Sequence, residues 1–153
     1  RLDRVFSAFD ALAKKHGLEK IKTIGDCYML VGGAPDKTGG HADRVVQMAQ
    51  DMQAASADFS KNAWPGFQVR IGIHTGSAVA GVIGQSKFAY DVWGDTVNIA
   101  ARLEEACAPD EILISGETRN LLTEHSGIDV KMDFDLKGRG SYEAWKVPVV
   151  FTS

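Results

Sequence analysis

The sequence has 153 residues, of which 44% are hydrophobic and 24% charged, and its formal net charge is −3. A chain of this length forms one domain with a sizeable core, and it needs neither a disulfide nor a structural metal to fold. The slightly acidic balance excludes a broad basic surface for nucleic acid or anionic lipid. No apolar run approaches the ~18 residues of a membrane span. We therefore expect membrane contact only through regions outside this sequence.

The two cysteines, Cys27 and Cys107, lie in unlike contexts and do not form a spaced metal-binding pattern. We expect both to be reduced thiols of an intracellular, cytoplasmic domain. The four histidines show no mutual metal spacing either, and we assign none of them a role.

The first half of the sequence predicts a helix, a hairpin and a second helix. Apolar residues at helical spacing over 1–12 predict a helix that ends near Gly17. Two short strands, 19–24 and 27–32, fold about a glycine-aspartate turn, and a glycine-rich loop precedes a helix expected over 41–60. Because the helical pattern is already present at Arg1, we expect the sequence to begin inside a larger protein.

The second half predicts more strands and one long helix. Residues 67–73 alternate at period 2, and the small residues of 74–84 predict a strand pair. A helix should begin at Asp95 or Thr96, either of which can cap it, and end near Cys107. The remaining patterns predict a strand at 111–115, a helix at 116–124, a strand at 128–136 with one apolar face, a turn at 137–140 and a strand at 142–149.

This order of elements predicts an α+β domain with a mainly antiparallel sheet covered by helices. The elements fit a ferredoxin-like βαββαβ core followed by a C-terminal α/β extension. The first strand of that core is absent from the sequence.

The hairpin turn carries a candidate metal ligand. Gly25 lets the backbone approach a ligand closely, and the Asp26 carboxylate at an exposed turn suits a hard cation such as Mg²⁺. The simpler interpretation is an ordinary Gly-Asp turn with Lys22 solvated.

The helix expected after residue 95 carries a candidate phosphate-binding pair. Asn98 and Arg102 are four residues apart and project from one face, as donors suited to charge that develops on phosphate. Alternatively, Arg102 pairs with Glu104 or Glu105, and Asn98 caps locally.

A basic glycine turn lies near the end of the sequence. Lys137 and Arg139 could touch phosphate oxygens there, although basic glycine turns are also common in ordinary hairpins.

Three stretches of the sequence resemble the class III nucleotidyl cyclase catalytic domain, which is the family of adenylyl and guanylyl cyclases. In chain order they are EKIKTIGDCYM, YDVWGDTVNIAARLE and LKGRG. The resemblance covers nearly the whole chain. It implies that Asp26 binds metal, that Lys22 and Asp91 read the purine, and that Asn98 positions the ribose. It further implies that Arg102 stabilises the pentavalent phosphorus, and that Lys137, with Arg139 as a possible neighbour, contacts the triphosphate.

The choice of base follows from hydrogen-bond polarity. Adenine offers an acceptor at N1 and a 6-amine donor, whereas guanine reverses both. Lysine only donates and ionised aspartate only accepts, so Lys22 and Asp91 fit adenine. Guanylyl cyclases of this family typically carry an acidic residue and a cysteine at these two positions, so guanylyl cyclase activity is the weaker alternative.

The resemblance implies a phosphorus-oxygen lyase, an adenylyl cyclase that converts ATP to 3′,5′-cyclic AMP and pyrophosphate. Two divalent metal ions, Mg²⁺ or Mn²⁺, would assist in-line attack of the ribose 3′-oxygen. The family builds its sites between two catalytic domains, and this chain carries residues of both sets, which implies a homodimer.

One family feature is missing. The family's first strand carries a second metal-binding aspartate, and nothing in residues 1–153 matches it, so we expect that strand to lie before Arg1. The rival hypothesis is a catalytically incomplete nucleotide-binding or regulatory half that pairs with another cyclase domain. A diguanylate-type cyclase would need a GGDEF-like turn, which the sequence around Gly25 does not supply.

Overall fold

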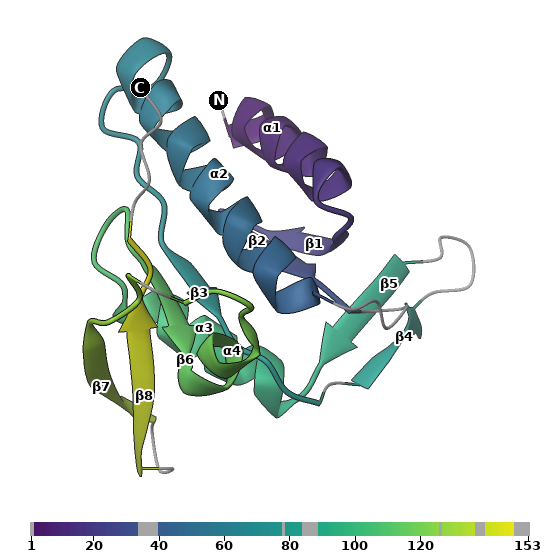
Figure 1. The fold of residues 1–153 in the computed structure, drawn as a ribbon. Coiled ribbons are helices and arrows are strands. Elements are labelled where there is room, and N and C mark those ends of the chain that lie inside the picture. The colour runs from purple at the N-terminus through teal and green to yellow at the C-terminus, as the bar shows by residue number, and fades with distance from the viewer. Residues whose placement is uncertain are drawn as a thin grey trace.

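A computed structural model describes residues 2–33, 40–77, 79–83, 89–125, 127–136 and 140–148, with only the backbone described at 79–83 and 89–93 (Figure 1). Within these residues the elements are, in chain order, α1 (Leu2–Lys15), β1 (Glu19–Ile24), β2 (Cys27–Val31), α2 (His41–Asn62), β3 (Ile71–Ile73), β4 (Val79–Ile83), β5 (Ala89–Trp93), α3 (Asp95–Ala106), β6 (Ile112–Ser115), α4 (Gly116–Leu121), β7 (Lys131–Leu136) and β8 (Gly140–Lys146).

The main sheet has the strand order β3-β6-β8-β7. The β3–β6 pair is parallel, and the β6–β8 and β7–β8 pairs are antiparallel. Two further antiparallel ribbons, β1–β2 and β4–β5, complete the described strands. The mixed α+β architecture with mainly antiparallel strands is as predicted.

The main sheet is covered on both faces. Ile112 and Ile114 of β6 belong to a core cluster with Val46 and Ala49 of α2. Leu113, between them in sequence, belongs to a second cluster with Leu103 of α3. Because successive side chains of a strand point to opposite faces, α2 and α3 cover opposite faces of the sheet. All four residues of β6 are buried, as expected of a strand covered on both sides.

A third cluster joins α1, α2 and the β1–β2 hairpin. Its buried members include Val5 and Phe9 of α1 and Met48 of α2, and Tyr28 and Leu30 of β2 pack against it. The rings of Phe9 and Tyr28 meet edge to face with their centroids 5.6 Å apart. Figure 1 shows α1 alongside α2, on the side of α2 away from β7 and β8.

The strand predicted at 67–73 is wrong in its first half, since β3 contains only Ile71–Ile73. The backbone of Val69 bonds instead to Asp110: the Asp110 amide donates to the Val69 carbonyl at 2.8 Å, and the Val69 amide donates to Asp110 Oδ1 at 3.2 Å. The backbone groups of Val69 thus bond to Asp110 in a loop and not to a neighbouring strand.

Of the strand pair predicted within 74–84, the described residues form one strand, β4, and the predicted pairing is wrong. Residues 74–77 lie outside the strands, and β4 pairs with β5, a strand that the sequence interpretation did not predict. The predicted caps of the next helix are wrong as well: Gly94, with φ 123°, precedes α3, and no side chain caps it. The Thr96 hydroxyl donates instead to the Ser77 carbonyl.

The strand predicted at 128–136 begins only at Lys131. Val130, predicted to share the apolar face, is 57% exposed, whereas Leu136 is buried as expected. Residues 137–139 of the turn predicted at 137–140 lie outside the described residues.

Candidate active site

Helix α3 presents Asn98 and Arg102 on a face beside its buried one. Ile99 and Leu103 of the same helix are buried against the sheet, whereas Asn98 is exposed and the Arg102 side chain is 41% exposed. Arg102 Nη1 lies 2.9 Å from Glu105 Oε2, three residues along the helix. An exposed pair of this kind contributes little free energy, so the guanidinium remains available to a more strongly charged ligand.

The hairpin carries Lys22 and Asp26 as predicted. Lys22 is half-buried in β1, and Asp26 is exposed in the turn, where Gly25 adopts φ 58°. Such a positive φ favours glycine, so the turn depends on Gly25. The Asp26 carboxylate forms no hydrogen bond or ion pair with another of the described residues.

Strand β5 carries Asp91 and contacts both the hairpin and α3. Asp91 pairs with Gly81 in the β4–β5 register. Residues of β5 contact both β1 and α3. The backbone positions of Lys22 and Asp91 and the helix of Asn98 and Arg102 are therefore gathered around one strand. Lys137 and Arg139, the predicted triphosphate contacts, lie outside the described residues.

In the described part of the chain, the predicted metal site has one carboxylate, that of Asp26. Among the described residues, no group of three or more His, Cys, Asp or Glu side chains could hold a metal ion. Mg²⁺ typically takes only one or two protein carboxylates and completes its shell with water and substrate phosphate. Asp26, exposed and without a protein partner in the described part of the chain, fits one such ligand.

A polar cluster that the sequence interpretation missed lies between the ends of β3 and β6. His74 Nδ1 lies 2.8 Å from Ser115 Oγ, and the hydroxyls of Thr75 and Thr118 are 2.8 Å apart. Ser115 also caps α4 by accepting from the Thr118 amide at 3.3 Å. Because Ser115 is 41 residues from His74, the cluster exists only in the folded chain, and no local pattern indicates it.

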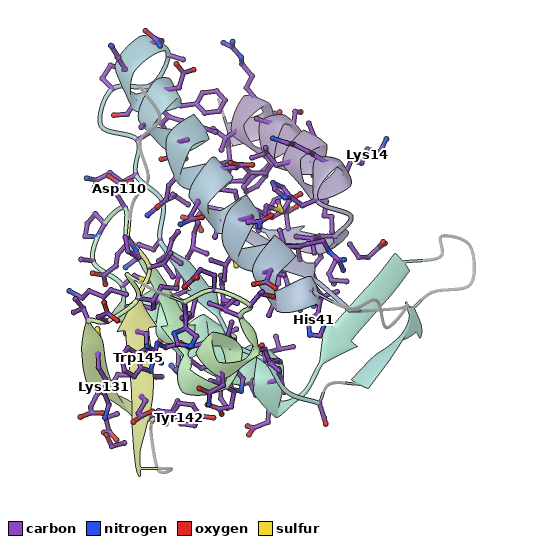
Figure 2. All side chains as sticks on the ribbon, in the orientation of Figure 1. Lys14, His41, Asp110, Lys131, Tyr142 and Trp145 are labelled. Carbon is purple, nitrogen blue, oxygen red and sulfur yellow. The ribbon has the colours of Figure 1, made fainter. Side chains whose placement is uncertain are left out.

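The charge state of His74 follows from its surroundings. Burial lowers the pKa of His74, and Glu117 and Asp95 oppose this shift. The ring packs edge to face against Tyr142 at 5.8 Å, and the Tyr142 hydroxyl donates to Glu117. Figure 2 shows Tyr142 on β8. Burial and the Glu117 bond raise the pKa of Tyr142 to about 12, so its hydroxyl stays protonated.

Both cysteines are free thiols, as predicted, with Cys27 exposed and Cys107 buried. Burial raises the pKa of Cys107 to about 12, which leaves this thiol unreactive at neutral pH. None of the helices in the described ranges is long and apolar enough to cross a membrane.

The sequence matches the model of a known family. The family model described as the adenylate and guanylate cyclase catalytic domain matches residues 1–148. The chain therefore belongs to this family of catalytic domains, as the sequence resemblance predicts.

Its relatives include both kinds of cyclase. An adenylate cyclase of Mycobacterium tuberculosis (strain ATCC 25618 / H37Rv) is 38% identical over 144 residues, which cover 94% of this chain and 32% of the relative. The human guanylate cyclase soluble subunit beta-2 is 37% identical over 142 residues, covering 91% of this chain and 23% of the relative. The chain thus spans about a third or less of the relatives it matches.

Solved structures show the same fold. The catalytic core of a rhodopsin-guanylyl cyclase with converted specificity, in complex with ATPαS, matches with a TM-score of 0.84 and 34% identity over 97% of this chain and 81% of that one. The adenylyl cyclase CyaB from P. aeruginosa matches with a TM-score of 0.77 and 29% identity over 96% of this chain and 80% of that one.

Proposed function

We propose that residues 1–153 form the catalytic domain of an adenylyl cyclase, a phosphorus-oxygen lyase that converts ATP to 3′,5′-cyclic AMP and pyrophosphate. The observation that carries this proposal is the contact of β5 with both β1 and α3, since it gathers the positions of Lys22, Asp91, Asn98 and Arg102. Relatives that are adenylate cyclases support it. The two free thiols support a cytoplasmic location.

Lys22 and Asp91 would select the base. Lys22 donates to adenine N1, and Asp91 accepts from the 6-amine. Guanine would place its N1–H donor against the donor Lys22 and its O6 acceptor against the acceptor Asp91. A buried site of this kind leaves polar groups unpaired against the wrong base, which discriminates by up to ~10⁴–10⁵-fold. The contact between β1 and β5 supports this assignment, because the two side chains must act on neighbouring atoms of one ring.

Asn98 and Arg102 would act on the ribose and the reacting phosphate. Asn98 orients the ribose so that its 3′-oxygen lies in line with the α-phosphorus. Arg102 exchanges its exposed Glu105 partner for the phosphate oxygens and donates where negative charge builds up. Lys137 and Arg139 would hold the leaving pyrophosphate.

Asp26 would hold one of two divalent ions, Mg²⁺ or Mn²⁺. When bound, the ions lower the charge cost of the entering and leaving oxygens. The described part of the chain offers one exposed carboxylate for this purpose and no complete site of its own.

Two copies of the domain would form a homodimer with two composite sites. In this arrangement one copy supplies Asp26, and its partner supplies the base, ribose and phosphate contacts. The solved guanylyl cyclase domain from Blastocladiella emersonii that is described as a non-canonical dimer supports dimerisation of this fold.

The test is an assay of the full-length protein with ATP and with GTP, in Mg²⁺ and in Mn²⁺. We expect cyclic AMP as the main product. Replacing Lys22 by Glu together with Asp91 by Cys should shift the preference toward GTP.

Two other results would count against the proposal. Cyclic GMP as the main product of the unmodified protein would favour the guanylyl cyclase alternative. Nucleotide binding without either product would favour the regulatory half.

A further inference from the structure

The β1–β2 hairpin contains an irregularity just before the base-reading lysine. The paired positions are Lys20 with Leu30 and Lys22 with Met29, so the register shifts between Lys20 and Lys22. Between these two pairs β1 moves on by two residues and β2 by only one. Ile21 is therefore the extra residue of a β-bulge. In a regular strand, Lys20 and Lys22 would share a face.

The bulge sends the two lysines to opposite faces. Directly paired residues of an antiparallel ribbon lie on the same face. Lys20 therefore shares the face of Leu30 and Tyr28, both of which pack against the α1–α2 core. Lys22 shares the opposite face with Met29.

The second face is turned toward the candidate site. Cys27 lies two residues before Met29 and so shares its face. The pKa of Cys27 is raised by burial and, next, by the charge of Glu104 in α3. Together with the contact between β1 and β5, this indicates that the Lys22 face looks toward β5 and α3.

Two polar side chains, Asp10 and Tyr28, hold Lys20 on the first face. Lys20 Nζ lies 3.1 Å from Asp10 Oδ1, and the Tyr28 hydroxyl donates to the same carboxylate oxygen at 2.6 Å. The Lys20 ammonium also lies 5.4 Å from the centre of the Tyr28 ring. Burial and the bond to Asp10 raise the pKa of Tyr28, so its hydroxyl remains a donor at all ordinary pH values.

We infer that Asp10, Lys20 and Tyr28 form a positioning cluster that fixes the shifted register of the hairpin and so leaves Lys22 as the lysine that reads the base. This inference rests on the proposed function of Lys22. None of the three residues touches the nucleotide. They act by keeping Lys20 on α1, out of the site, and by fixing the strand from which Lys22 projects.

The test compares the Kd values of ATP and GTP, each with Mg²⁺, in the full-length protein by competition with a fluorescent nucleotide. Tyr28→Phe and Asp10→Asn should each reduce the preference for ATP by about tenfold, because a displaced lysine loses its alignment with the base. Lys20→Arg, which keeps the charge beside Asp10, should retain most of the preference.

Asp51→Asn is the matched control. Asp51 of α2 holds the end of α1 through His16 at 2.7 Å and Lys15 at 3.6 Å. Asp51→Asn should lower the unfolding temperature by about as much as Tyr28→Phe and Asp10→Asn do, without changing the ratio of the Kd values for ATP and GTP. A ratio that stays within twofold in Tyr28→Phe and Asp10→Asn, while their unfolding temperatures fall like that of Asp51→Asn, would make the cluster merely structural.

Lys22→Glu separates this inference from the proposed function. If Lys22→Glu changes the ratio and the cluster variants do not, only the positioning role is wrong. If Lys22→Glu leaves the ratio unchanged, Lys22 does not read the base, and both proposals are overturned.

Discussion

Gly72 of β3 lies directly against Ala100 of α3, so that a Cβ added to Gly72 would overlap the Ala100 carbonyl oxygen. The same Cβ would lie 2.9 Å from the Cβ of Leu103. The absence of a side chain at Gly72 thus allows α3 to approach β3 at backbone distance. Since α3 carries Asn98 and Arg102, this contact sets the position of the candidate catalytic helix relative to the sheet.

Gly72→Ala should therefore move or destabilise α3. Overpacking of a filled core typically costs about 1–3 kcal/mol, and a displaced α3 should also lower kcat. The measurements are urea unfolding and cyclic AMP production.

Gly116→Ala is the control for this substitution. Its added Cβ would meet the Glu143 carboxylate at 3.1 Å, and that flexible side chain can move away. Stability and activity should stay close to those of the unmodified protein. Equal stability of Gly72→Ala would show that α3 adapts more easily than this packing implies.

Arg102→Ala should lower kcat by about 10²–10³-fold and change KM much less, as for the loss of one transition-state donor. The matched variant is Glu105→Gln, which removes the charge of the carboxylate 2.9 Å from Arg102 and leaves the guanidinium in place. We expect that variant to retain its activity. An increase in KM alone for Arg102→Ala would instead assign the arginine to ground-state binding.

Parts of the fold could be predicted because they depend on local patterns. The boundaries of the β1–β2 hairpin follow from alternation about Gly25-Asp26. The bulge at Ile21 could not be predicted, since the same alternation permits a regular register. Strand β5 was missed because it is a short run that ends in a helix-opening sequence, and its pairing with β4 is non-local.

The candidate site also has parts that local patterns predict and parts that depend on contacts between distant residues. Arg102, considered alone, had a sufficient structural explanation in its pair with Glu105, and the structure contains that pair. The family resemblance supplied the role that spacing could not. Neither route identified Asp10 and Tyr28, because their bond joins α1 to β2 across 18 residues.

His74 should make the stability of the domain depend on pH. Its pKa is lowered by burial in the folded state, so below the ordinary value near 6.5 the unfolded chain binds a proton more readily. The contribution of His74 is present above about pH 6.5 and is lost as the pH falls through its lowered folded-state pKa.

The measurement for His74 is the free energy of unfolding between pH 5 and 7.5, compared for the unmodified protein and His74→Asn. The pH dependence should be weaker in His74→Asn. His125→Asn, at an exposed position, should keep the dependence of the unmodified protein. Identical pH profiles for the unmodified protein and His74→Asn would contradict the lowered pKa of this half-buried imidazole.

Mixing two inactive variants tests the composite sites of the proposed homodimer. Asp26→Ala and Arg102→Ala should each be nearly inactive alone. In a mixed dimer one site collects both substitutions, and the other has an intact Asp26 from one copy and an intact Arg102 from the other. Random pairing makes half of the dimers mixed, so about one quarter of the sites regain activity.

The control mixture combines Lys22→Ala with Arg102→Ala. Both residues belong to the set that one copy contributes, so each site of the mixed dimer keeps one substitution, and the activity should not exceed the mean of the two variants measured alone. Recovery in this second mixture, or no recovery in the first, would show that Asp26 and Arg102 do not act across the interface. A titration of one variant against a fixed amount of the other, followed by cyclic AMP production, distinguishes these outcomes, because recovery should be maximal at equal amounts.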